Sequence, residues 1–138
     1  MEKQLLYIIE DGYITKCIYA DEILNAYSLK SAINQIAGDF FINIKGYQHE
    51  VRKRTSLKNK IPLYLSPQAL FFYYFDRAGR RYLINYFALV GAFYDDDIIF
   101  VFKSGVILRL DSSLPVLKKE IKKVCEITNH LKKMYALS

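Results

Sequence analysis

This sequence has no apolar stretch close to the roughly 20 residues that a transmembrane helix needs. The longest candidate, residues 82–94, is more typical of a buried pair of strands or of one long bent strand. The first 13 residues, MEKQLLYIIEDGY, contain too short an apolar run for a signal peptide and show no cleavage pattern. We therefore expect a cytoplasmic protein with no transmembrane segment.

Cysteine is scarce, with only Cys17 and Cys125 among the 138 residues. The two lie far apart and form no CxxC pair, so the usual signals of a zinc site or a dithiol redox centre are absent. Each lies in an apolar segment, and free cysteine is among the most buried residue types. We expect two buried, free thiols in preference to a disulfide, which agrees with a reducing compartment.

The sequence also lacks the motifs of common catalytic sites. It has two histidines, and it contains no HExxH zinc motif, no nucleophile elbow and no glycine-rich phosphate loop. The three consecutive aspartates Asp95, Asp96 and Asp97 are more typical of a solvated turn than of a metal site, because no second carboxylate cluster accompanies them. We expect no enzymatic activity, no catalytic residues, no bound metal and no cofactor.

Aromatic residues are abundant even though tryptophan is absent. The chain has 12 tyrosines and 9 phenylalanines, and apolar residues make up 52% of it. This composition excludes a disordered chain, and a length of 138 residues suits one domain with its own core. Since tyrosine and phenylalanine favour pleated, half-buried surfaces, we expect a single sheet-rich domain over residues 1–138.

The N-terminal part of the chain predicts a hairpin and a helix. Residues 4–20 consist of two β-prone runs around Asp11-Gly12, a favoured pair for a tight hairpin turn. The helix is predicted to begin after Ser28, which is a suitable N-cap, and to end at Gly38. Its apolar residues recur at helical spacing.

Two further helices are predicted, one basic and one amphipathic. The basic helix lies within residues 47–59, because Gly46 precedes it and Pro62 disfavours helical geometry in the residue before it. The amphipathic helix begins near Pro115, since proline suits the first turn of a helix, and it continues toward the C-terminus. Its apolar residues form one stripe that can pack on a sheet.

The segment between the two predicted helices has the pattern of strands. The predicted strands are residues 61–65, 69–75, 81–94, 98–102 and 106–110. The longest of them is expected to bend near Gly91. Together these elements predict an α+β fold with a mostly antiparallel sheet, a basic helical insert and a C-terminal amphipathic helix.

Positive charge is concentrated in short segments of a chain whose net charge is +6. Residues 45–60 hold six Lys or Arg against one Glu, and a second basic group occupies DRAGRR at residues 76–81. A solvated helix face is one interpretation of the first cluster, and a surface that binds phosphates is the other. The candidate anion-binding residues are Lys45, Arg52, Lys53, Arg54, Lys58, Lys60, Arg77, Arg80 and Arg81.

From Ile33 to about Val124 the chain resembles the ComK-type competence transcription factors of Gram-positive bacteria. That family carries an aromatic pair, a glycine with basic residues and a K-x-P-I step into a strand, which here read DFFINIKGYQHEVRKRTSLKNKIPLYL. An aromatic strand, a short insert, another strand, an acidic turn and an F-x-x-G-x-x-x-x-L hairpin follow. Here they read LFFYYF, DRAGRR, YLINYFALV, DDD and FKSGVILRL.

The resemblance implies a DNA-binding activator of a competence-like gene programme. Such a protein recognises AT-rich DNA through the minor groove and assembles as a homo-oligomer on double-stranded DNA, with RNA polymerase or a regulatory adaptor as a further expected partner. Phosphate contacts are expected from Lys45, Arg52, Lys53, Arg54, Lys58 and Lys60. Arg77, Arg80 or Arg81 is expected to enter the minor groove, because a narrow groove attracts arginine.

A module of the pleckstrin-homology type is the alternative prediction. A strand-rich domain closed by a C-terminal helix shares that outline, and its basic loops can contact anionic lipid head groups or a protein partner.

Overall fold

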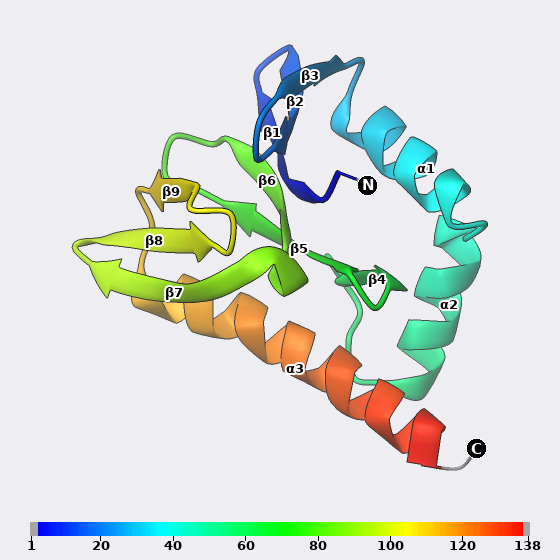
Figure 1. Cartoon of the computed structure of the whole chain (residues 1–138). Coiled ribbons are helices and arrows are strands. Elements are labelled where there is room, and N and C mark those ends of the chain that lie inside the picture. Colours follow the sequence, from blue (N-terminus) through cyan, green and yellow to red (C-terminus); the bar gives the residue numbers. More distant parts are fainter. Residues whose placement is uncertain (1–2, 137–138) are drawn as a thin grey trace.

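A six-stranded antiparallel sheet forms the centre of the molecule (Figure 1). The structure, a computed structural model, describes residues 3–136 and the side chains of residues 3–130. Helix α1 (Leu29–Asp39) packs on one face of the sheet, and α2 (Ile44–Arg54) follows beside the β4 edge. A three-stranded sheet and helix α3 (Leu114–Ala136) cover the other face. The predicted α+β fold with antiparallel sheets and a C-terminal helix is confirmed.

The strand order in the larger sheet is β3-β2-β1-β6-β5-β4, and that in the smaller sheet is β7-β8-β9. The larger sheet contains β1 (Leu5–Asp11), β2 (Ile14–Tyr19), β3 (Ile23–Ala26), β4 (Leu63–Ser66), β5 (Ala69–Phe75) and β6 (Arg81–Asn85). The smaller sheet contains β7 (Leu89–Asp95), β8 (Asp97–Phe102) and β9 (Ile107–Leu110). The pairing of β1 with β6 places the N-terminal hairpin against a strand from the second half of the chain.

The predicted N-terminal hairpin is formed by β1 and β2. Its turn residues are Gly12 and Tyr13, because Asp11 pairs with Ile14. Gly12 has a φ of +62°, which glycine adopts without the steric cost that a Cβ would add. The short strand β3 is absent from the sequence-based prediction, because three of its four residues are exposed and show no alternation.

Helix α1 begins where the sequence predicts and ends differently. The Ser28 side chain accepts a hydrogen bond from the Ser31 backbone N–H at 3.0 Å and caps the helix. Gly38 lies inside the helix, and the left-handed residue after its end is Phe41, with a φ of +58°. The prediction that Gly38 terminates the helix is therefore wrong, although only by one residue in position.

Helix α2 begins earlier and ends earlier than predicted. The Asn43 Oδ1 atom accepts a hydrogen bond from the Gly46 backbone N–H at 2.8 Å, so the helix starts at Ile44 and includes this glycine. The helix ends at Arg54, with Thr55 as its C-cap. The basic side chains of residues 58 and 60 consequently lie on the connection to β4 and not on a helix.

Residues 81–94 form two strands in different sheets instead of one strand bent at Gly91. Asn85 ends β6, and its buried Oδ1 accepts hydrogen bonds from the backbone N–H groups of Leu70 and Phe87, each at 3.2 Å. The short 3-10 helix η1 (Tyr86–Ala88) then carries the chain into β7. The amide side chain therefore sets the position at which the chain leaves the larger sheet.

Apolar cores fill both sides of the larger sheet. On one side Phe72 and Tyr74 pack against Phe100 of the smaller sheet, and the ring centroids of Tyr74 and Phe100 are 5.4 Å apart. Leu117 and Val124 of α3 complete this core. The core beneath α1 consists of Leu5, Ile8, Leu29, Ala32, Ala37, Leu63, Leu65, Ala69, Phe71 and Leu83.

Both cysteines are free, as predicted, but neither is fully buried. Cys17 is half-buried on β2, and burial raises the pKa of its thiol. Cys125 is exposed on α3, so the prediction of a buried thiol is wrong there. Val124 faces the sheet, and the next residue of the helix is rotated about 100° away from it, which brings Cys125 to the surface.

Candidate nucleic-acid interface

Helix α2 packs on the cores through Ile44, Val51 and Tyr47, and Tyr47 also forms hydrogen bonds. Its hydroxyl donates a hydrogen bond to the Pro62 carbonyl at 2.6 Å and accepts one from the Tyr64 backbone N–H at 3.1 Å. Burial raises the pKa of Tyr47 to about 12, so the phenol keeps its proton at neutral pH and remains a donor. This contact fixes α2 beside the edge strand β4.

The opposite face of α2 is basic and exposed. Lys45, His49, Arg52 and Lys53 follow one another at spacings of three or four residues or lie adjacent, so they share one side of the helix, away from Tyr47. All four are exposed, and α2, which lies entirely within the described residues, contributes no fully buried residue. We call these four residues the α2 basic face.

Most cations of this region are not neutralised by carboxylates. Arg54 Nε donates to Glu50 Oε2 at 3.0 Å, and this bond holds the pKa of Glu50 below its usual value. Arg52 Nε donates to the backbone carbonyl of Lys58 at 3.0 Å, which leaves its charge uncompensated. Among the side chains of residues 3–130, no carboxylate forms an ion pair with Lys45, Arg52, Lys53, Lys58 or Lys60.

The connection from α2 to β4 is held in place by α3. Glu126 of α3 accepts hydrogen bonds from the backbone N–H and the hydroxyl of Ser56, both at 2.8 Å. The Lys60 ammonium lies 4.0 Å from the centroid of the Phe75 ring, a cation–π contact at the end of β5. Lys58 and Lys60 therefore project from a fixed segment next to the basic helix.

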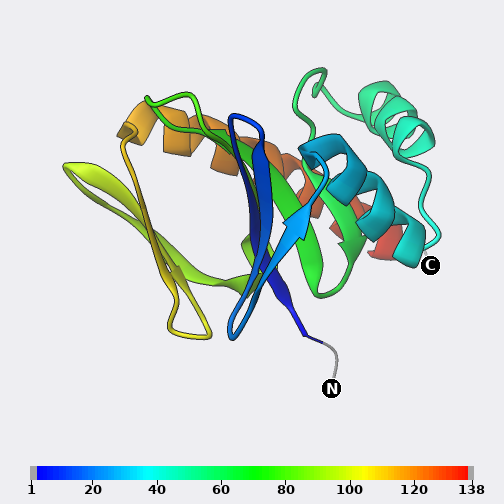
Figure 2. The same cartoon turned by 90° about the horizontal axis from the view of Figure 1, so that it is seen from above.

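The three arginines of the DRAGRR segment are all engaged in ion pairs. Arg77 pairs with Asp111 at 2.6 Å, Arg80 Nε pairs with Asp76 Oδ2 at 2.8 Å, and Arg81 pairs with Glu10. Arg77 and Arg80 belong to the β5–β6 turn, which lies near the end of β9 and the start of α3, far from α2 (Figures 1 and 2). The prediction that these side chains contact DNA stays a prediction, and it requires them to exchange a carboxylate for a phosphate.

Asp76 is the buried centre of that turn. Its side chain is 0% exposed and accepts hydrogen bonds from the Arg80 guanidinium, the Arg80 backbone N–H and the Tyr82 hydroxyl. The ion pair with Asp76 raises the pKa of Arg80, and burial raises the pKa of Tyr82. A buried carboxylate needs such partners, so Arg80 has a structural role here.

A cleft of about 820 Å³ between α1, α2 and the larger sheet brings together residues of both predicted groups. Lys45 of α2 and Arg81 of β6 line it, together with Lys30 of α1 and the amide of Gln48. Glu10, the one carboxylate among the described residues that line it, is already bonded to Arg81 and to the Leu29 backbone N–H. The cleft therefore carries excess positive charge, and Lys30 is a cation that reasoning from the sequence missed.

The aspartates at residues 95–97 contribute to the β7–β8 turn and to an ion pair within the smaller sheet. Asp97 pairs with Arg109 at 3.0 Å, and Asp96 occupies the left-handed position of the β7–β8 turn with a φ of +60°. Within the described part of the chain, no group of three or more potential metal ligands is present. The same residues include no helix that is both long and apolar enough to span a membrane.

Comparison with known proteins returns no match to a family model, a curated protein or a solved structure. The resemblance to the ComK-type factors therefore remains a prediction.

Proposed function

We propose that this protein is a DNA-binding transcriptional regulator of the ComK type, which holds the phosphates of AT-rich duplex DNA with the α2 basic face. The observation that carries the proposal is the alignment of Lys45, Arg52 and Lys53 on one exposed side of a helix, without carboxylate partners among the described side chains. Phosphate contacts of this kind supply most of the affinity of proteins for DNA.

The dimensions of α2 suit a backbone contact. Its 11 residues extend for about 16 Å, enough to follow several phosphates along one strand. Lys58 continues the basic surface beyond the end of the helix, and Arg81 and Lys30 continue it into the cleft. A solvated face would not need cations from three separate elements around one cleft.

Preference for AT-rich DNA is assigned to Arg81. This residue is the member of the DRAGRR segment that lies in the cleft beside Lys45, whereas Arg77 and Arg80 stabilise the β5–β6 turn. An arginine next to a phosphate-binding helix can reach a narrow minor groove, where the negative potential is strongest. Arg81 must release Glu10 to do so.

The test is a salt titration of affinity for duplex DNA by fluorescence anisotropy. If Lys45, Arg52, Lys53, Lys58 and Lys60 each contact one phosphate, the slope of log K against log salt should be about −4 to −5. The triple variant Lys45→Ala, Arg52→Ala, Lys53→Ala should flatten this slope by about 2.7. A wild-type slope flatter than about −2 would overturn the proposal.

A matched control removes the same charge elsewhere. The triple variant Lys103→Ala, Lys118→Ala, Lys119→Ala removes three exposed cations from the β8–β9 turn and the N-terminal part of α3, and none of them lines the basic cleft. Its slope should stay within about one unit of the wild type. If both triple variants flatten the salt slope equally, only net charge determines binding. Preferential binding to anionic vesicles over duplex DNA would favour the pleckstrin-homology alternative.

A further inference from the structure

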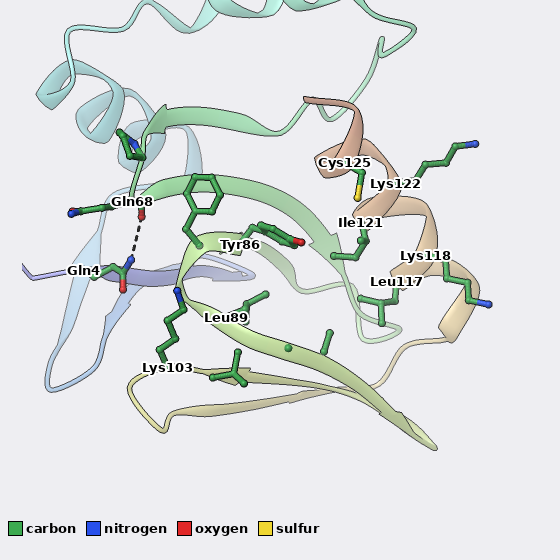
Figure 3. A pocket seen from close by; sticks show the side chains of 15 residues that line it. Gln4, Gln68, Tyr86, Leu89, Lys103, Leu117, Lys118, Ile121, Lys122 and Cys125 are labelled. Carbon is green, nitrogen blue, oxygen red and sulfur yellow. Dashed lines mark hydrogen bonds between the residues drawn. The ribbon is translucent and has the colours of Figure 1, made fainter. Parts of the chain in front are cut away.

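A second cavity lies between the smaller sheet and α3 (Figure 3), and it shares no lining residue with the basic cleft. Its volume is about 870 Å³. Leu89 and Tyr86 line it from the sheet side, and Leu117, Ile121 and Cys125 of α3 line it from the other (Figure 3). The cavity therefore has apolar walls formed by a strand and a helix that face each other.

The strand that borders this cavity is an edge strand. β7 pairs with β8 on one side and, within the described residues, with no strand on the other. Four consecutive residues of β7, Leu89 to Ala92, line the cavity. The register of β7 with β8 shifts between Leu89 and Gly91, and this β-bulge interrupts the usual alternation of side chains, so all four residues can border the cavity beside the open edge of β7.

The charge around the cavity is entirely positive. Lys103 lies at the end near η1, and Lys118 and Lys122 project outward from α3 at the rim (Figure 3). Among the side chains that the structure describes, no Asp or Glu lines the cavity. Val90 of β7 is 66% exposed. The bulge at this position is one of the usual protections of an edge strand, but residues 89–92 carry no charged residue and no proline.

We propose that the open edge of β7, with the facing surface of α3, binds an extended acidic peptide segment of a partner protein, which adds to the smaller sheet as a fourth strand. Backbone hydrogen bonds to β7 supply affinity in this mode, and alternate side chains of the peptide enter the apolar cavity. Acidic side chains on the other face of the peptide meet the lysines. This surface is separate from α2, so the proposal does not depend on DNA binding.

An extended peptide fits these features better than a compact ligand. Four residues of strand edge span about 13 Å, and a new strand would lie about 4.8 Å from β7. A small amphipathic acid would use the apolar walls and one lysine, and it would leave the backbone edge without a role. Binding of decanoate in place of the peptide would overturn the proposal.

The probe is a fluorescent peptide of about eight residues in which Val and Glu alternate, measured by anisotropy with the full chain. Methylation of every second backbone nitrogen blocks one hydrogen-bonding edge of the peptide and leaves its side chains unchanged. Two methylated peptides are needed, one with the odd-numbered nitrogens methylated and one with the even-numbered nitrogens methylated. Strand addition uses one edge of the peptide, so one of the two should lose affinity by about tenfold or more and the other should bind nearly normally. Equal affinities of the two methylated peptides, or no binding of the parent peptide, would overturn the proposal.

Charge reversal locates the binding surface. Lys103→Glu with Lys118→Glu, one residue from each side of the cavity, should weaken binding by about tenfold or more. Lys16→Glu with Lys119→Glu changes the same net charge at exposed positions that do not line the cavity, and it should change affinity by less than about threefold. Bound peptide should also slow alkylation of the exposed Cys125 thiol. Equal losses in the two double variants, or unprotected Cys125, would contradict the assigned surface.

Discussion

Two segments of this protein each carry three basic residues, and the contacts of these residues are very different. The last turn of α2 carries Arg52, Lys53 and Arg54, and the β5–β6 segment carries Arg77, Arg80 and Arg81. In the first segment two of three cations have no carboxylate partner among the described side chains, whereas in the second all three are paired. A cation that is counted in a sequence is therefore not always free to bind a ligand, and Arg81 must first release Glu10.

The difference arises from what surrounds each segment. The β5–β6 turn folds over the buried Asp76, which requires a cation and several donors. α2 lies outside the sheet and is held by the Tyr47 hydroxyl. The cations on its outer face therefore have no buried carboxylate to pair with. Charged groups in the turn act on stability, and those on α2 are free to act on affinity.

The largest expected effect comes from charge reversal on α2. Lys45→Glu with Lys53→Glu should lower affinity for duplex DNA by about 100-fold or more near physiological salt, because two phosphate contacts become repulsive. The free energy of unfolding should change little, since both side chains are exposed. Anisotropy titrations and urea denaturation measure the two quantities, and unchanged DNA affinity would remove the distinction between the segments.

Loss of a charge from the β5–β6 turn should lower stability and leave DNA affinity nearly unchanged. Arg80→Ala leaves the buried Asp76 carboxylate without its cation, so the free energy of unfolding should fall. Affinity of the folded protein for GC-rich duplex should stay within about threefold of the wild type. Arg80→Lys, which keeps a charge near Asp76, should recover part of the stability in urea denaturation. A variant that loses DNA affinity and keeps its stability would assign Arg80 to DNA.

Tyr47 tests how α2 is attached. Tyr47→Phe removes a hydrogen bond to the Pro62 carbonyl and one from the Tyr64 N–H, at a cost of about 1.5 kcal/mol in unfolding free energy. The pKa of this phenol is raised from 10 to about 12, so its contribution is complete below pH 10 and is lost as pH rises through about 12. The stability difference between wild type and variant should therefore shrink over this range, and a constant difference in chemical denaturation would contradict the raised pKa.

The smallest expected effect separates two arginines within one segment. Arg81→Ala should lower affinity for an AT-rich duplex by about fivefold and leave GC-rich affinity less affected, because Arg81 lies in the basic cleft. Arg77→Ala should change neither, since Arg77 lies beside Asp111 at the far end of the molecule. An unchanged ratio of AT-rich to GC-rich affinity in the Arg81 variant would leave any sequence preference to α2.

Local features of the fold could be predicted from the sequence because local chemistry determines them. Gly12 marks a hairpin turn and Ser28 caps a helix, and each acts through atoms a few residues away. The end of α1 was less predictable, because Phe41 adopts a left-handed conformation that usually falls to glycine. The start of α2 differs from the prediction because the Asn43 cap offsets the low helix propensity of Gly46, which lies inside the helix.

The candidate site could be predicted only in part because its electrostatics depend on distant contacts. Arg81 and Glu10 are 71 positions apart, and they meet only because β6 pairs with β1. Lys30 reaches the cleft through the packing of α1, which periodicity alone does not place relative to α2. The exposure of Cys125 likewise follows from the rotation of α3 on the sheet and not from the residues next to it in sequence.

The outer face of α2 can change in evolution without endangering the fold. Because the helix buries none of its residues fully, substitutions at Lys45, His49 or Lys53 open no cavity and leave no buried charge without a partner. Relatives of this protein could therefore diverge in ligand preference through single, individually tolerated steps on that face. The β5–β6 turn has no comparable freedom, since replacement of Arg80 must be matched by a change at Asp76.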